Sequence, residues 1–540
     1  MQLFPFIAII VPLLGVGGVL GLSRVPRVRT YTRYVALAAV SLTTVSLLAS
    51  RWIEPRIVVP SLWQPSLLFG ATLALQVGAT AQPLALALAL MTCCTLLVDL
   101  SRSKAPSPLL VAILQALLAA GILTLWAANT LTTLISWAIY DLLQTGGHLA
   151  SGKSTRTAIR SLVFSGLATL LFWVGTLVSG GETGSELWSL MTPGGTQIAL
   201  WSMAGLLRLW AYPFHLAVQE NPGDVPPLSV PLSLGPMVGW GLWIRLALAN
   251  GGFIPGGVWV PILGAVNLGL GGFLAWCCES PRRMLSWIGM AANGAILLSA
   301  GLAGDSAAGV VTAGSVAWAV GVGLISLGDG LRWDVPWQGI PSLVGASTLL
   351  GLPLTLGFVT GANLVGGLAR GGSLGLGGAF FLGNVLLIPA LVRWLLNTPI
   401  SSWPARRGLA VARGIGLGLP VLLLILAGMH PPLLVRNDLA PSLGRLLAMP
   451  SVVGWLLWMM SLVGGGVLAW RDAVIYPKVG LLLRATHDLL SLEWLWSAVV
   501  GALDRGFGVL RAADEVVGGG GALLWSWLLL LLLLLVWGSG

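Results

Sequence analysis

The chain has 540 residues, of which 56% are hydrophobic and only 9% are charged. This composition excludes a soluble globular domain and indicates a membrane protein with many spans. A formal net charge of +10 would favour nucleic acid as the partner of a soluble protein, but here the basic residues lie in short loops between apolar runs, where they set orientation in the bilayer. We therefore expect a lipid bilayer as the surroundings and no nucleic-acid partner.

The apolar runs predict the fold class. A helix needs about 20 apolar residues to cross a bilayer, and by that rule the sequence holds about sixteen candidate spans. This predicts an all-α polytopic membrane protein. The basic residues gather in alternate loops, which places both termini on the non-cytoplasmic side of a bacterial inner or thylakoid-type membrane.

Two segments interrupt the succession of spans. Prolines and β-branched residues in 51–81 predict an extended or hairpin-like cap on the outer face. Charged residues in 471–520 alternate with Leu and Trp at near-helical spacing, which predicts an amphipathic lateral helix along the membrane surface or along neighbouring helices. The predicted parts of the chain are 1–107 with the first three spans, 108–250 and 251–398 with five spans each, 399–470 with two spans, the lateral helix 471–520, and a terminal span in 521–540.

The two central sets of five spans resemble each other. Each has a proline-interrupted member in the corresponding place, run 197–219 with Pro213 and run 341–366 with Pro353. Paired interrupted helices in two inverted halves are the best sequence indication of a transport site in a secondary transporter. We therefore expect two inverted five-helix repeats with broken helices 7 and 12.

Few residues in the apolar runs could carry ions. Arg208 and His215 share run 197–219, Asp141 falls in run 130–146, and Asp329 ends run 307–328. A charge inside the bilayer is a functional hypothesis by default. Arg208 precedes His215 by seven residues, so in a regular helix they would share one face about two turns apart. We predict these four residues as ion-path candidates.

Each candidate also has a structural interpretation. Arg208 would pair with an acid such as Asp141 or with freed carbonyls, His215 would be a satisfied histidine at a helix end, and the two aspartates would be interfacial carboxylates. Because arginine does not release its proton near neutral pH, Arg208 can fix a charge but cannot relay one. This favours the structural interpretation of Arg208. The four cysteines form two adjacent pairs without metal-ligand spacing, so we predict neither a metal site nor a cofactor.

Several stretches carry a resemblance to a known family. They are SLWQPSLLFG before the third span, LISWAIYDLL, GLLRLWAYPFHLAV, VPPLSVPLSLGPMVGWGLW, ESPRRMLSWIGMAANGAILL and LLGLPLTLGFVTG. In this order they resemble the antiporter-like membrane subunits of complex I (NADH or ferredoxin:quinone oxidoreductase) and of Mrp-type cation/proton antiporters, over roughly residues 1–430. The remaining spans and the lateral helix resemble the distal subunit of that group.

The resemblance implies a set of proton-transfer positions, and this sequence departs from nearly all of them. The family's helix 5 glutamate falls on Ala138, with Asp141 one turn further as a substitute, and its helix 7 lysine falls on Arg208. The other titratable positions of the family fall on Ser233, Gly239, Gly361 and the vicinity of Trp318 and Val322. The scaffold is therefore expected to be retained and the pumping chemistry to be lost or altered.

These features predict a membrane-arm subunit of a complex I-like or Mrp-like assembly, mainly structural, with proton or cation translocation impaired and other membrane subunits as partners. Any redox chemistry would belong to the assembly. The alternative is an active proton, cation or bicarbonate-linked transporter or channel that uses Arg208 and Asp141.

Overall fold

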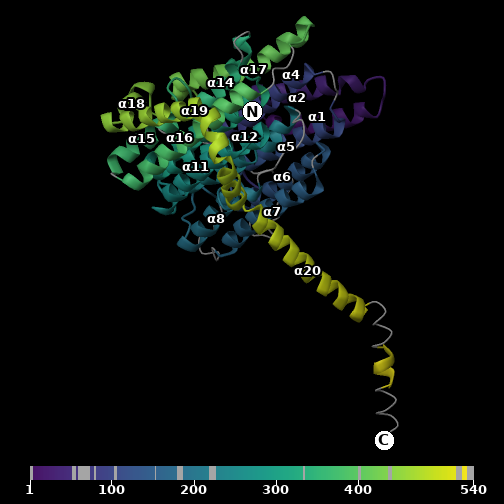
Figure 1. Cartoon of the computed structure of the whole chain (residues 1–540). Coiled ribbons are helices and arrows are strands. Elements are labelled where there is room, and N and C mark those ends of the chain that lie inside the picture. Colours follow the sequence, from purple (N-terminus) through teal and green to yellow (C-terminus); the bar gives the residue numbers. More distant parts are fainter. Residues whose placement is uncertain are drawn as a thin grey trace. The chain divides into compact units, whose positions relative to one another are not determined.

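The structure is a computed structural model of the chain. It describes residues 4–51, 56–58, 73–77, 81–102, 106–152, 154–178, 187–217, 227–331, 335–371, 373–398, 403–435, 441–518 and 526–531. The chain divides into two compact units, Met1–Gly480 and Leu481–Gly540. In the first unit, helices α1 to α18 gather into one bundle (Figure 1).

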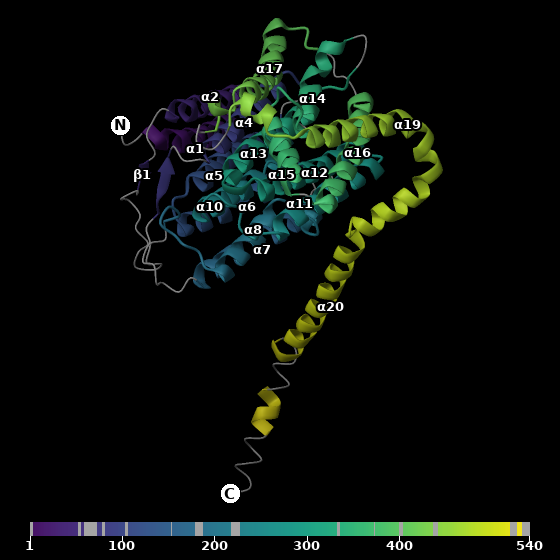
Figure 2. The ribbon, with the colours of Figure 1, turned by 90° about the vertical axis from the view of Figure 1, so that its left-hand side faces the viewer.

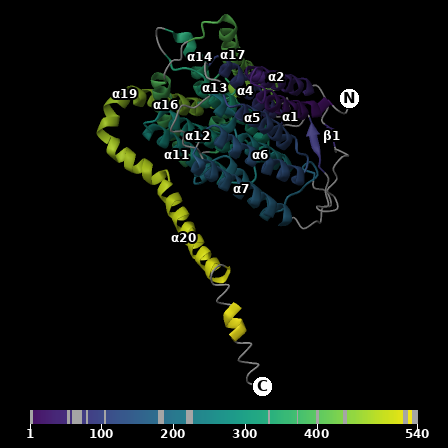
Figure 3. The same ribbon diagram turned by 90° about the vertical axis from the view of Figure 1, so that its right-hand side faces the viewer.

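The N-terminal half of the first unit begins with a pair of helices that pack on each other and on α5 (Figure 3). Its elements are α1 (Phe4–Ser23), η1 (Arg29–Tyr31), α2 (Thr32–Ser50), β1 (Arg56–Val58), β2 (Leu75–Val77), α4 (Gln82–Leu100), α5 (Pro108–Trp126), α6 (Thr130–Ala150), α7 (Thr155–Val178), α8 (Gly195–Arg208), η2 (Phe214–Ala217), η3 (Pro227–Ser229), α9 (Val230–Ser233) and α10 (Pro236–Ala249). Strands β1 and β2 pair antiparallel, so the described part of segment 51–81 is extended as predicted.

The second half is built around α11, α12 and α16, which pack together (Figure 2). Its elements are α11 (Trp259–Cys277), α12 (Pro281–Leu302), η4 (Gly304–Ser306), α13 (Ala307–Leu327), α14 (Pro336–Leu349), α15 (Phe358–Gly371), α16 (Leu374–Asn397), α17 (Arg407–Met429), η5 (Pro431–Leu433) and α18 (Leu443–Ala448).

Helix α13 lies at the centre of the first unit. It packs against α10 and α4 of the first half and against α12, α14, α15 and α17 of the second. Nearly all of its side chains are buried. Its sequence alternates small residues with β-branched ones, which lets neighbouring backbones approach closely. Helix α13 is therefore a central contact between the two halves, which also meet where α4 packs against α17.

The C-terminal helices are long. Helix α19 (Val452–Leu490) runs without a break through the predicted start of the lateral helix at 471, and α20 (Glu493–Gly518) follows a turn in which Leu492 has a φ of 55°. The predicted amphipathic segment is thus helical. Of the predicted last span, only 526–531 lies within the described residues, and it is helical.

Twelve helical stretches of the described residues are long and apolar enough to cross a bilayer. Four of the sixteen predicted spans are absent from this set. The last lies mostly outside the described residues, and the other three are absent for physical reasons. Run 197–219 and run 341–366 are each broken, so that α8, α14 and α15 have 14 residues each. Helix α6 is long enough, but its buried face carries polar residues. The all-α polytopic membrane fold is confirmed.

A polar cluster fixes the middle of α19 to the bundle. Asp472 accepts hydrogen bonds from Arg393 (2.7 Å) and from the indole N–H of Trp276 (2.9 Å). The same guanidinium donates to the carbonyls of Trp276 and Cys278 at the end of α11, and Tyr476 donates to the carbonyl of Cys277. These carbonyls have no partner further along α11, so the cluster caps that helix and anchors α19 at once.

Candidate functional site

The first broken helix lies between α8 and η2. The helix ends at Arg208, the chain reverses its hand at Trp210 with a φ of 56°, and Pro213 falls within the irregular stretch. A break inside the bilayer frees backbone groups that need new partners. Here the amide of Asn293 donates to the carbonyl of Leu209 at 3.0 Å. The side-chain oxygen of Asn267 accepts from the N–H of Tyr212 at 2.6 Å.

Asn293 lies on α12 and Asn267 on α11, so helices of the second half of the bundle supply hydrogen-bond partners to the backbone at the break in the first half. Asn293 also accepts a hydrogen bond from the indole of Trp240 on α10, at 3.1 Å. Asn267 and Asn293 are 0% and 1% exposed. Polar contacts from α11 and α12 thus support the broken geometry, and α10 in turn holds Asn293.

Arg208, at the last turn of α8, forms a two-pronged ion pair with Asp141 on α6. One guanidinium nitrogen donates to each carboxylate oxygen, both at 2.8 Å. Both side chains are 4% exposed. A cation is also favoured at this place because the last turn of a helix carries the negative end of its dipole.

Two further side chains complete the enclosure of the pair. Thr169 on α7 accepts a hydrogen bond from Arg208 at 2.9 Å and donates its own proton to Asp141 at 2.9 Å. The ring of Trp137 lies under the guanidinium carbon of Arg208, 3.9 Å from its centroid. Such planar stacking suits arginine and its delocalised charge. Four residues from three helices thus hold one neutral, closed unit.

His215 does not continue the face of Arg208, and the predicted two-turn spacing on one helix is wrong. The helix stops at Arg208, and His215 lies beyond the break, in η2. Its ring stacks on Tyr212, with centroids 5.0 Å apart and planes at 7°, and lies 5.1 Å from Trp287. It is 1% exposed. Helical periodicity does not extend from Arg208 to His215, because the helix ends before the proline-containing stretch.

Asp329 follows α13 and belongs to a second buried ion pair. Arg413 on α17 donates to it at 2.6 Å, and the two side chains are 7% and 5% exposed. Trp403 lies over the guanidinium of Arg413, at 4.8 Å. Asp329 is therefore not an exposed interfacial carboxylate. The ion pair of Asp329 and Arg413 is separate from the pair of Arg208 and Asp141, which α6, α7 and α8 hold. The structure therefore does not bring Asp329 together with Arg208.

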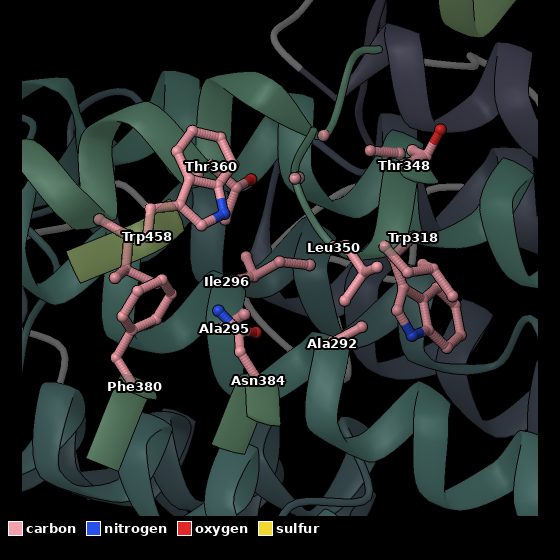
Figure 4. Close-up of a pocket in the computed structure, with 17 residues that line it drawn as sticks. Ala292, Ala295, Ile296, Trp318, Thr348, Leu350, Thr360, Phe380, Asn384 and Trp458 are labelled. Atoms are coloured by element: carbon pink, nitrogen blue, oxygen red, sulfur yellow. The ribbon is translucent and has the colours of Figure 1, made fainter. Parts of the chain in front are cut away.

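The second broken helix lies between α14 and α15 and includes Pro353. Its backbone also enters the left-handed region, at Gly351 (φ 71°) and Leu354 (φ 68°). A cavity of about 30 Å³ lies beside this break, which is room for about two water molecules. Figure 4 shows Trp318 and Thr348 at one end of the cavity, and Thr360, Phe380 and Trp458 at the other.

The positions implied by the family resemblance fall in unequal surroundings. Ala138 is exposed, so a glutamate there would face away from Arg208, whereas Asp141 is buried against it. A Cβ atom on Gly239 would lie 2.9 Å from the Cβ of Arg208, and one on Gly361 would lie 2.8 Å from the carbonyl of Gly351 and 3.2 Å from Trp458. Both glycines therefore lie where no side chain fits.

The polar face of α6 extends beyond Asp141. Gln144 and His148 are buried on the same side, at helical spacings of three and four residues, and Gln144 donates to the carbonyl of Leu232 at 2.7 Å. These two residues were not among the predicted site residues, although the spacing of Asp141, Gln144 and His148 indicates one polar stripe. Thr169, Asn267 and Asn293 carried no comparable signal, because lone polar residues are common in long membrane helices.

Within the described ranges, no three His, Cys, Asp or Glu side chains come together in a way that could hold a metal ion.

Comparison with known proteins gives matches in structure and none in sequence. No protein-family model and no curated protein sequence matches the chain. A chain of the Mrp complex from Dietzia sp. superposes with a TM-score of 0.78 and 18% identity, over 99% of this chain and 63% of that one. The present chain thus spans less than two thirds of that subunit.

Two other membrane complexes contain a similar chain. In the membrane-bound sulfane sulfur reductase, an archaeal respiratory complex, the match has a TM-score of 0.74 and 17% identity over the full length of both chains. In respiratory complex I from Thermus thermophilus it has a TM-score of 0.61 and 18% identity, over 79% of this chain and 98% of that one. The chain has the fold of an Mrp and complex I type membrane subunit. The predicted resemblance is confirmed at the level of the fold.

Proposed function

We propose that this protein is a membrane subunit of a multisubunit assembly of the complex I or Mrp type, mainly structural, with its own proton or cation translocation impaired. The likeness in fold to chains of three membrane complexes, over 79% to 100% of this chain, supports the kind of assembly. One observation carries the impairment: the buried, two-pronged pair of Arg208 and Asp141, closed by Thr169 and Trp137.

The chemistry of the ion pair does not suit proton transfer. Proton transfer needs a group that can gain and lose a proton within hydrogen-bond reach of the next one. Arginine side chains in general do not release a proton near neutral pH, and both oxygens of Asp141 are already engaged by the guanidinium of Arg208. Opening this pair would leave an unpaired charge in a low-dielectric interior, which is strongly unfavourable. The charges therefore hold α6 to α8 and relay nothing.

The second broken helix supports the same conclusion. Gly361 has no side chain that could titrate, and the indole of Trp458 from α19 lies against the place where a side chain would begin. Phe358, Trp455 and Trp458 stack on one another beside it, with centroids 5.4 to 6.2 Å apart. An aromatic stack of this kind offers packing area and no proton acceptor.

The outer helices supply the surfaces that a scaffold subunit would need. Helix α7 and helix α17 each expose an apolar stripe at helical spacing, which fits bilayer lipid or a neighbouring membrane subunit. The exposed residues are Ile159, Val163, Leu167, Leu170, Trp173 and Leu177 on α7, and Val411, Ile415, Leu419, Leu422 and Leu426 on α17. The termini lie on the non-cytoplasmic side in this proposal, as the distribution of basic loops favours.

Purification of the tagged chain from its native membrane in a mild detergent tests this function. We expect it to elute with other membrane subunits as one complex. The double variant Arg208→Met/Asp141→Leu, which removes both charges and keeps the volume, should support assembly and the activity of the complex as well as the unaltered chain does. Elution as a single subunit, or loss of the activity of an intact complex in the double variant, would favour the active transporter instead.

A further inference from the structure

The short connection between α1 and α2 carries positive charge that no acidic side chain balances. Arg24, Arg27 and Arg29 lie there, and all three side chains are exposed. Within the described ranges, none of them takes part in an ion pair. Residues 1–53 contain no Asp or Glu. This end of the two helices therefore presents a net positive surface.

The start of α17 extends this positive surface. Helices α2 and α17 end together, because Arg51, directly after α2, donates to the carbonyl of Pro432, shortly after α17, at 2.8 Å. Helix α4 packs on both of them, and α1 packs on α2 (Figures 1 and 3). The starts of α2 and α17 therefore lie at the same end of the bundle, where Arg406 and Arg407 are exposed.

Exposed apolar stripes on α1 and α2 lead to the arginines. On α1 the stripe recurs every three or four residues as far as Arg24, and its members are Ile10, Leu14, Gly17 and Gly21. On α2 the members are Tyr34, Ala38, Leu42 and Val45. Stripes of this kind fit the acyl chains of a lipid. Tyr31 and Tyr34, whose exposed rings lie 6.5 Å apart, are of the residue type that favours the membrane–water interface.

The connection is too short to lift its arginines out of the headgroup layer. Helix α1 ends at Ser23 and η1 begins at Arg29, and the headgroup layer is about 5–8 Å thick on each side of the hydrocarbon core. Arginine binds phosphate through a planar fork of N–H donors. An acidic protein from the aqueous phase would meet the arginines but not the apolar stripes beneath them. The combination of the two features therefore favours a lipid.

We propose that this basic surface, formed by Arg24, Arg27, Arg29, Arg406 and Arg407, binds the headgroup of an anionic phospholipid. The arginines donate hydrogen bonds to the phosphate oxygens, and the acyl chains lie along the stripes of α1 and α2. Phosphatidylglycerol fits this chemistry because the phosphate is its one charged group. Phosphatidylcholine fits less well because the surface repels its quaternary ammonium group, and inorganic phosphate lacks the acyl chains.

Equilibrium binding of radiolabelled phosphatidylglycerol to the delipidated full chain in a neutral detergent tests this surface. We expect saturable binding that unlabelled phosphatidylglycerol competes. Phosphatidylcholine and, at constant ionic strength, inorganic phosphate should not compete. Arg24→Gln/Arg27→Gln should weaken the binding about twentyfold, since each arginine at an anionic lipid surface contributes a factor of about five. Arg24→Lys/Arg27→Lys keeps both charges and should retain most of the affinity.

Arg370→Gln/Arg445→Gln is the matched control. These two arginines are also exposed, but they lie on α15 and α18, which do not belong to the basic surface. Their replacement lowers the net charge of the chain by the same amount, and the affinity for phosphatidylglycerol should not change. Equal affinities of the two glutamine double variants, or equal binding of phosphatidylglycerol and phosphatidylcholine by the unaltered chain, would overturn the proposal. Binding of soluble polyglutamate in preference to phosphatidylglycerol would also overturn it and would assign the surface to an acidic protein.

Discussion

Replacement of Arg208 by methionine should destabilise the protein by about 3–5 kcal/mol, because it leaves the Asp141 carboxylate buried without its partner. Thr169 alone cannot replace two charge-assisted hydrogen bonds. Asp141→Leu should lower the free energy of unfolding by a similar amount, since it leaves the guanidinium of Arg208 buried without its partner. The free energy of unfolding in mixed detergent micelles, titrated with a denaturing detergent, measures both effects.

The double variant Arg208→Met/Asp141→Leu separates a structural pair from two independent charges. When both partners are replaced by apolar residues of similar volume, a buried pair often loses little stability. We expect the double variant to recover most of the stability lost in either single one, so that the coupling energy amounts to several kcal/mol. Additive losses would contradict the interpretation that the pair acts as one neutral unit.

Asn293→Leu should destabilise the first broken helix by about 2–6 kcal/mol, because it strands two buried groups at about 1–3 kcal/mol each. These groups are the carbonyl of Leu209 and the indole N–H of Trp240. The expected result is a lower free energy of unfolding together with faster hydrogen exchange around the break.

Asn363→Leu provides the control for this experiment. Asn363 is also 1% exposed, but its amide donates to Val359 within its own helix, α15. Its replacement removes a donor only from the carbonyl of Val359, which already has a partner within the helix. We therefore expect the free energy of unfolding to fall by less than about 1 kcal/mol. If the two variants were equally destabilised, the asparagine of α12 would not be what holds the break open.

The spans and both breaks could be predicted from the sequence because bilayer thickness and proline act locally. Runs of about 20 apolar residues mark helices whatever their neighbours are, and Pro213 and Pro353 each lie in the irregular stretch that they predict. The pairing of Arg208 with Asp141 was one of two predicted alternatives, the other being freed carbonyls. A buried cation in a membrane needs a partner, and the apolar runs contain few acidic residues.

The details of the site could not be predicted because they depend on contacts far apart in the chain. Thr169 bridges the ion pair from a helix whose sequence gives no sign of it. Arg413 pairs with Asp329 from α17, 84 residues further along the chain. The position of His215 was wrong because periodicity was extended across a proline, where the helix had already ended.

Proton flux into proteoliposomes tests the central claim most directly. The purified chain would be reconstituted alone, a membrane potential imposed with a potassium gradient and valinomycin, and internal pH followed with a trapped dye. We expect a flux equal to that of protein-free liposomes, unchanged in the Arg208→Met/Asp141→Leu variant. A flux well above that of protein-free liposomes that the double variant abolishes would show that Arg208 and Asp141 conduct, and would contradict this account.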